Sequence, residues 1–122
     1  MLSLRQDQMD DMHALTRGVF VDRMVEHLNQ FFPKHCAALG VSGVREAIDY
    51  GIERASAYGI VGERDVCLYI DLMFGFGKDF DTDPELPWAA SVLNDERIAG
   101  AKQRINILHE TAVREASQAG GG

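Results

Sequence analysis

The sequence has few of the residues that build cross-linked or membrane-spanning proteins. Its 122 residues include two cysteines, three prolines and one tryptophan. The longest apolar stretch, near residues 67–76, is about half as long as the ~20 residues that a membrane-spanning helix needs. The first residues show no cationic leader followed by an apolar core, which disfavours a secretory signal. We therefore expect a cytoplasmic protein with no membrane partner.

The two cysteines carry no redox or metal signature. Cys36 and Cys67 are far apart in the sequence, form no Cys-x-x-Cys motif and have mainly apolar neighbours. Reduced cysteine in such surroundings behaves as a small hydrophobic residue, so we expect free thiols. The histidines also lack the spacing of zinc ligands: His13, His27, His35 and His109.

Basic residues are scarce relative to acidic ones. Twelve Lys and Arg residues against 19 Asp and Glu residues give a net charge of −7. Such a charge repels phosphate backbones, which disfavours nucleic acid and favours a basic or neutral protein surface as the partner. Gly75 and Gly77 lack the strand and the Lys-Ser/Thr context of a phosphate-binding loop, so no cofactor is predicted.

Helical periodicity runs through most of the chain. Apolar residues at spacings of three to five predict a first helix over about 4–32 with an inward stripe: Met9, Met12, Leu15, Val19, Met24, Leu28 and Phe31. Glycines at 40 and 59 are typical of helix ends. Further helices are predicted over 34–39, 42–58, 63–75, 86–93 and from Asp95 onward.

The predicted fold is therefore all-α: one compact helical bundle of about four main helices plus short ones. The helix near 63–75 is apolar nearly all round, so we place it at the centre. Residues 1–119 are expected to form a single domain, and 120–122 a flexible glycine tail.

The longest irregular stretch carries alternating acids. Oxygen ligands at alternating loop positions are typical of calcium sites. A calcium loop that begins at Asp79 would need glycine and glutamate where Pro84 and Ala90 stand. The alternative is a solvated loop whose aspartates cap turns. The carboxylates are therefore weak candidates for metal ligands: Asp79, Asp81, Asp83 and Glu85.

Asp71 lies within an apolar stretch, where an unpaired charge would cost several kcal/mol. We predict an internal ion pair that fixes how helices meet, with Arg54 or Arg104 as its basic member. The alternative is a general base with a raised pKa.

Aromatic residues interleave with the acids of the same loop. Apolar anchors ringed by acids suit a partner that is apolar at its centre and basic at its rim. The alternative is that these aromatics fold inward and tie the loop down. The predicted protein-binding residues are Phe76, Asp79, Phe80, Asp81, Asp83 and Trp88.

Short motifs give the chain a family resemblance over roughly residues 15–115. They are YGIERA at 50–55, YGI at 58–60, ERDV at 63–66, LMF at 72–74, DFD at 79–81 and PWA at 87–89. In these the chain resembles small uncharacterised bacterial proteins encoded beside type VI secretion components and their effectors. The resemblance implies an accessory role, such as an adaptor or co-chaperone for a secreted effector or a spike-tip protein.

The sequence thus favours a non-enzymatic protein-binding module. Self-association is compatible with it. Two alternatives stay open: a small enzyme that uses Asp71 or the loop of Asp79, Asp81 and Asp83 for metal or acid–base chemistry, and a calcium-binding structural domain.

Overall fold

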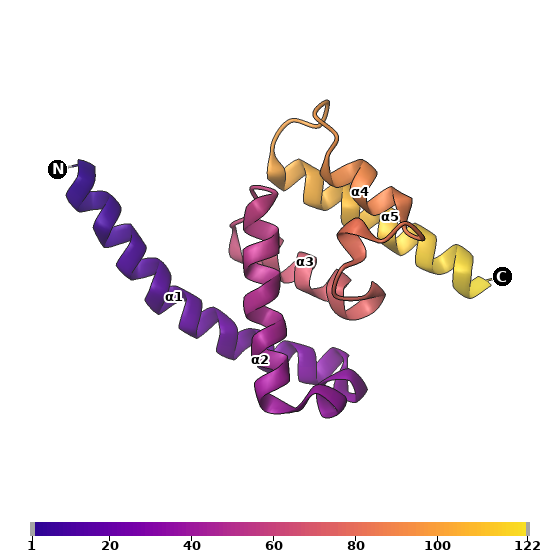
Figure 1. The fold of residues 1–122 in the computed structure, drawn as a ribbon, viewed down its shortest axis with the longest axis horizontal. Coiled ribbons are helices and arrows are strands. Elements are labelled where there is room, and N and C mark those ends of the chain that lie inside the picture. The colour runs from indigo at the N-terminus through magenta and orange to yellow at the C-terminus, as the bar shows by residue number, and fades with distance from the viewer. Residues whose placement is uncertain (1, 122) are drawn as a thin grey trace. The chain divides into compact units, whose positions relative to one another are not determined.

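The computed structural model describes the backbone of residues 2–121 and the side chains of residues 17–118. Within these residues all regular structure is helical, which confirms the all-α class (Figure 1). None of the described helices combines the length and hydropathy that a bilayer crossing requires. The elements are α1 (Leu2–Phe31), α2 (Pro33–Ala57), α3 (Glu63–Phe76), the 3-10 helix η1 (Phe80–Thr82), α4 (Pro87–Leu93) and α5 (Ala101–Gly121).

The chain divides into two compact units, residues 1–46 and 47–122, and we describe each by itself. The boundary falls within α2. The prediction of one domain over residues 1–119 stays a prediction. Gly120 and Gly121, predicted to be a flexible tail, form the end of α5, and Gly122 lies outside the described residues.

The first unit contains α1 and the start of α2. Gly40 has φ +76° and interrupts the helical backbone, so α2 consists of a short helix and a longer one, as the sequence predicted. Arg45 bonds Asp22 of α1 at 2.7 Å. The buried apolar side chains of this unit are Phe20, Val21, Met24, Leu28, Cys36 and Val44.

The inward stripe predicted for α1 is partly wrong. Met24 and Leu28 are buried, but Val19 and Phe31 are 50% and 60% exposed. Met9, Met12 and Leu15 lie outside the described side chains. The buried positions 20, 24 and 28 repeat every four residues, close to the 3.6-residue period, and position 19 falls off that face. Phe31 shares the face but is the last residue of α1.

The second unit is organised around α3. Half of the residues of α3 are buried, and α3 contacts α5 and η1 while α4 packs along α5 (Figure 1). Tyr69 and Ile70 are fully buried. α2 approaches α3 closely at Gly51, because a methyl group there would lie 2.7 Å from Cγ1 of Ile70.

The last helix begins later than predicted. Asp95 was expected to cap it, but α5 begins at Ala101. Asp95 instead accepts hydrogen bonds from the backbone and the guanidinium of Arg97, each at 3.0 Å, within a turn. The chain then passes through Gly100, with φ +85°, before α5 starts. An Asx turn and a helix N-cap use the same side-chain acceptor, which explains the misplacement.

Candidate functional site

One face of α2 holds the loop that joins α3 to α4. Tyr50 and Arg54 of α2 and Tyr58, which directly follows it, are spaced four residues apart, so their side chains lie on one side of the helix. Each reaches an aspartate of the loop: Tyr50 donates to Asp79, and both Arg54 and Tyr58 donate to Asp81. Asp79 and Asp81 therefore attach the loop to this side of α2.

The inner attachment is centred on Asp81. Its side chain is fully buried, whereas that of Arg54 is 33% exposed. Oδ2 of Asp81 accepts from the Arg54 guanidinium and, at 2.7 Å, from the Tyr58 hydroxyl. We call Arg54, Tyr58, Tyr69 and Asp81 the anchor cluster. Because a buried carboxylate needs a cation and hydrogen bonds, the cluster fixes the loop in one position.

The electrostatics of the anchor cluster keep its tyrosines neutral. Burial, followed by the hydrogen bond to Asp81, raises the pKa of Tyr58 to about 12. Burial is also the main cause of the raised pKa of Tyr69, whose ring lies 6.3 Å from that of Tyr58. The hydrogen bond to Asp81 raises the pKa of Arg54. Arg54 and the two tyrosines therefore keep their protons at neutral pH.

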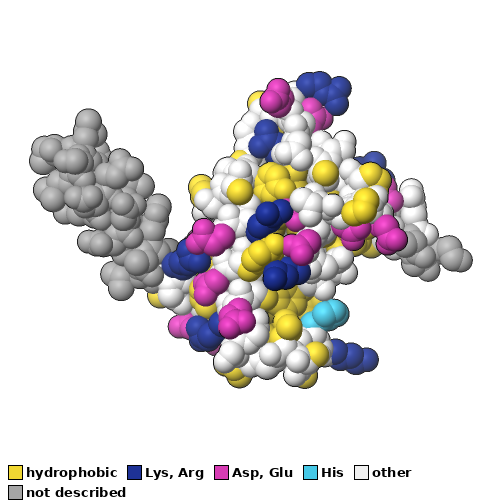
Figure 2. Space-filling view, viewed as in Figure 1, with side chains coloured by type: hydrophobic (Ala, Val, Ile, Leu, Met, Phe, Trp, Pro, Cys, Tyr) yellow, Lys and Arg dark blue, Asp and Glu magenta, His cyan; other side chains and the backbone are white. Residues whose placement is uncertain are grey.

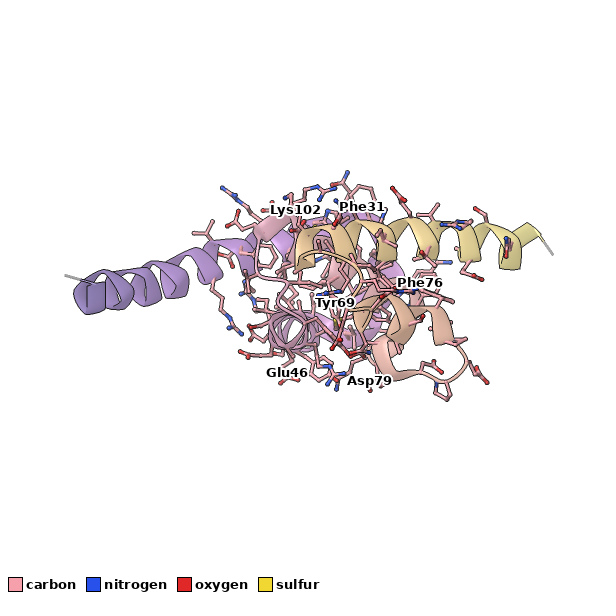
Figure 3. The ribbon with its side chains drawn as sticks, turned by 90° about the horizontal axis from the view of Figure 1, so that it is seen from above. Phe31, Glu46, Tyr69, Phe76, Asp79 and Lys102 are labelled. Carbon is pink, nitrogen blue, oxygen red and sulfur yellow. The ribbon has the colours of Figure 1, made fainter. Side chains whose placement is uncertain are left out.

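The outer attachment lies at the surface around Tyr50. The hydroxyl of Tyr50 donates to the exposed Asp79, and this bond raises the pKa of Tyr50. The Lys78 ammonium lies 4.3 Å from the centroid of the Tyr50 ring, within cation–π range. In Figure 3, Asp79 lies at the edge of the molecule and Tyr69 in its interior.

Phe80 does not lie on the surface, contrary to the prediction that it contacts a partner. It is 1% exposed, and its ring lies 5.1 Å from that of Tyr69. Asp81 is likewise buried and bonded to Arg54, so neither residue is available to a partner. The alternation of aromatic and acidic residues did not show which of them face inward. Phe80 lies in the 3-10 helix η1, which packs against α3 and α4.

Phe76 and Trp88 form a second aromatic pair at the two ends of the loop. Their rings are 5.2 Å apart and nearly perpendicular, a favourable edge-to-face geometry. Both side chains are half-buried, so part of each remains at the surface. We group these two aromatics with the acids of the intervening loop that do not bond Arg54, and call the group the acidic aromatic face: Phe76, Asp79, Asp83, Glu85 and Trp88.

The loop carboxylates are engaged separately and do not converge. Asp79 bonds Tyr50 and Asp81 bonds Arg54, while Asp83 accepts from the backbone N–H of Glu85 at 2.9 Å. Among the described residues, the four loop acids do not gather within the span of one metal ion. This geometry favours the interpretation in which the aspartates cap turns and attach the loop.

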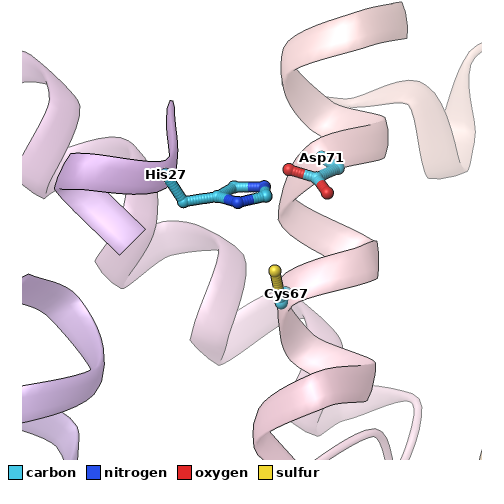
Figure 4. A group of neighbouring side chains, drawn as sticks. All are labelled: His27, Cys67 and Asp71. Carbon is cyan, nitrogen blue, oxygen red and sulfur yellow. The ribbon is translucent and has the colours of Figure 1, made fainter. Parts of the chain in front are cut away.

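Asp71 was predicted to pair with Arg54 or Arg104, and the structure gives both arginines other partners. Arg54 bonds Asp81, and Arg104 donates to the Ile98 carbonyl at 3.3 Å. Asp71 is half-buried and lies one turn from Cys67 on α3 (Figure 4). Burial, followed by the Asp71 charge, raises the pKa of the Cys67 thiol to about 11, so this cysteine is protonated at neutral pH.

Comparison with family models, curated proteins and solved structures finds no match to this chain.

Sequence reasoning missed the tyrosines of the site. Tyr50 and Tyr58 flank Arg54 at equal spacing, and a polar stripe of this kind on a helix can indicate a surface that receives a loop. Tyr69 lies in an apolar run, and nothing in that run indicates that its hydroxyl belongs to a site. The pairing with Asp79 and Asp81 depends on tertiary packing.

Proposed function

We propose that this chain is a non-enzymatic accessory protein that binds another protein through its acidic aromatic face. The observation that carries the proposal is the half-buried Phe76–Trp88 pair, whose two members are joined by a loop with exposed acids. Aromatic side chains are over-represented among residues that dominate binding energy, because they bury large areas with few rotatable bonds.

The charge of the face indicates the chemistry of its partner. Asp79 and Glu85 are exposed and Asp83 is half-buried, while the nearby Lys78 lies over the Tyr50 ring. The buried Asp81 is balanced by Arg54. A partner with an apolar centre and Lys or Arg at its rim would therefore be complementary, and its association would be faster at low ionic strength.

The face is preformed, which favours binding. The anchor cluster and the Tyr50–Asp79 bond hold the loop between Phe76 and Trp88. A surface that is already ordered loses less conformational entropy when a partner binds. In this proposal Asp79 and Asp81, which the sequence also suggested for metal or acid–base chemistry, serve to position the loop.

The resemblance drawn from the sequence motifs names the first partners to test. It supports an adaptor or co-chaperone role toward a type VI secretion effector or a spike-tip protein. An acidic helical protein suits such a role if the partner presents a basic apolar segment before it is delivered.

Capture of candidate partners by the immobilised chain tests the proposal. Type VI secretion effectors and spike-tip proteins, the partners that the resemblance implies, are offered to the parent chain and to Trp88→Ala and Glu85→Lys. We expect the parent to retain a partner and both variants to lose at least about tenfold in affinity, since hot-spot aromatics contribute about 2 kcal/mol or more.

Two matched variants serve as controls. Glu96→Gln and Glu110→Gln remove exposed acids of the same unit outside the face, and should bind as the parent does. Circular dichroism verifies that each variant is folded. Equal binding by the parent, Trp88→Ala and Glu85→Lys would place the binding surface elsewhere.

A further inference from the structure

The longest acid-free stretch of this acidic protein lies in its first unit. Residues 27–45 include Lys34 and Arg45 as well as two histidines, but neither aspartate nor glutamate, although the chain as a whole carries a net charge of −7. We call it the acid-free segment. It covers the end of α1 and the start of α2 in the first unit.

The acid-free segment also exposes large apolar side chains. Phe31, Leu39 and Val41 are 60%, 47% and 75% exposed. They are half of the exposed large hydrophobic residues among the described side chains; Val19, Val61 and Val113 are separate from them in sequence. Figure 2 shows exposed hydrophobic side chains lying among charged ones on the face it draws. Apolar exposure concentrated in one stretch is typical of an interaction surface.

Within the segment, the charged side chains are the basic Lys34 and Arg45. Lys34 and His35 are exposed next to Phe31, whereas Arg45 is bonded by Asp22 at 2.7 Å. The segment thus combines exposed apolar side chains with the exposed, cationic Lys34. This is the chemistry that the acidic aromatic face requires of a partner, so the chain itself contains a complement to its own binding face.

We propose that the acid-free segment of one copy docks on the acidic aromatic face of a second copy. Phe31, Leu39 and Val41 would cover the exposed parts of Phe76 and Trp88, with Lys34 facing the loop acids. The inference rests on the face assigned under the proposed function and adds the identity of one partner: this chain. An external protein that binds the same face would compete with the second copy.

The two surfaces differ, so the contact is head-to-tail. In such a contact every copy keeps one free surface of each kind, and association continues until a ring closes or a chain of copies grows. The contact pairs an acidic with a basic surface, so salt should weaken it.

Two complementary variants test the proposal. One carries Lys34→Glu and Val41→Ser, which alter only exposed side chains of the acid-free segment. The other carries Glu85→Lys on the acidic aromatic face. In sedimentation velocity the parent should show a mass that rises with concentration and falls with added salt. Each variant alone should remain monomeric.

Mixing the two variants decides the geometry. The Glu85→Lys protein retains its acid-free segment, and the other variant retains its face, so an equimolar mixture should form a dimer that grows no further. Val113→Ser, which alters an exposed apolar residue of α5, is the control and should associate like the parent. A parent that is monomeric up to about millimolar concentration, or a mixture that stays monomeric, overturns the inference.

Charge exchange gives an independent readout. A chain carrying both Lys34→Glu and Glu85→Lys should regain association that each single change reduces. Absence of that recovery would count against the pairing. Failure here is distinguishable from failure of the proposed function: a monomeric parent that still captures an external partner through Trp88 keeps the function and removes only the second copy.

Discussion

Gly51 of α2 lies directly against Ile70 of α3. A Cβ atom at position 51 would stand 2.7 Å from Cγ1 of Ile70 and 2.8 Å from Sδ of Met73. Real Cβ contacts are not that short, so glycine is the residue that allows the two helices to meet at this distance. Tyr50 and Arg54, which hold the loop, lie within one turn of Gly51 on the same helix. The close contact between α2 and α3 therefore also positions the residues that attach the loop.

We therefore predict that Gly51→Ala destabilises the protein although alanine is the better helix former. The gain in helix propensity is about 1 kcal/mol, whereas forcing a methyl group into a packed contact costs about 1–3 kcal/mol. Gly75→Ala is the matched control, because nothing lies within 4 Å of a methyl group there. Urea unfolding should show a lower midpoint for the first variant and an unchanged or higher one for the second.

Ile70→Asp should abolish the folded state. Ile70 is fully buried on the central helix of the second unit, and a carboxylate there would have no prepared partner. Circular dichroism and the sharpness of thermal unfolding provide the measurement. A cooperatively folded Ile70→Asp protein would show that α3 is not the centre of this unit.

Asp81→Asn should cost about 3 kcal/mol of unfolding free energy, because it leaves the Arg54 guanidinium without its buried counter-charge. Partial exposure of Arg54 places the effect near the low end of the range for buried pairs. Asp95→Asn removes the carboxylate of the exposed Arg97 pair and should leave the unfolding midpoint unchanged. Equal effects of the two changes would contradict the anchoring role of Asp81.

Alkaline pH should destabilise the second unit through Tyr58. Its pKa is about 12 in the folded protein and about 10 in an unfolded chain. The folded state therefore holds this proton more tightly, so the resulting stability is complete below about pH 10 and is lost as the pH rises toward 12.

The test is a pH titration of the parent, monitored by tyrosinate absorbance and by circular dichroism. Tyr58→Phe should show a smaller loss of stability over the same pH interval and a lower stability at neutral pH, because the hydrogen bond to Asp81 is gone. Identical pH dependence in the two proteins would assign the alkaline transition to other tyrosines.

The sequence predicted the helices well where the signal is local. Gly40 and Gly59 both adopt positive φ at the predicted helix ends, because no other residue takes that conformation as cheaply. The central helix followed from an apolar run that no exposed helix would carry. The predicted start of the last helix at Asp95 was wrong, because an aspartate that closes a turn cannot be distinguished in sequence from one that caps a helix.

The site depended on contacts between residues distant in sequence. Arg54 was correctly singled out as an internal cation, but its carboxylate is Asp81 and not Asp71. Phe80 and Asp81 are buried because the 3-10 helix that contains them packs against α3 and α4, which periodicity does not encode. The bonds from Tyr50 to Asp79 and from Tyr58 to Asp81, and the Phe76–Trp88 contact, depend on the tertiary structure and could not be predicted from the sequence.

The anchor cluster has a consequence for how this protein can tolerate changes in length. Phe80 packs on Tyr69, and Asp81 is bonded by Arg54 and Tyr58. An inserted residue between Gly77 and Asp83 would therefore displace a core side chain or a buried charge. The turn at residues 94–100 is different: most of it is exposed, and its Asp95–Arg97 bonds close within the turn itself. Insertions, epitope tags and attached fluorophores therefore belong in that turn, where they leave the binding loop untouched.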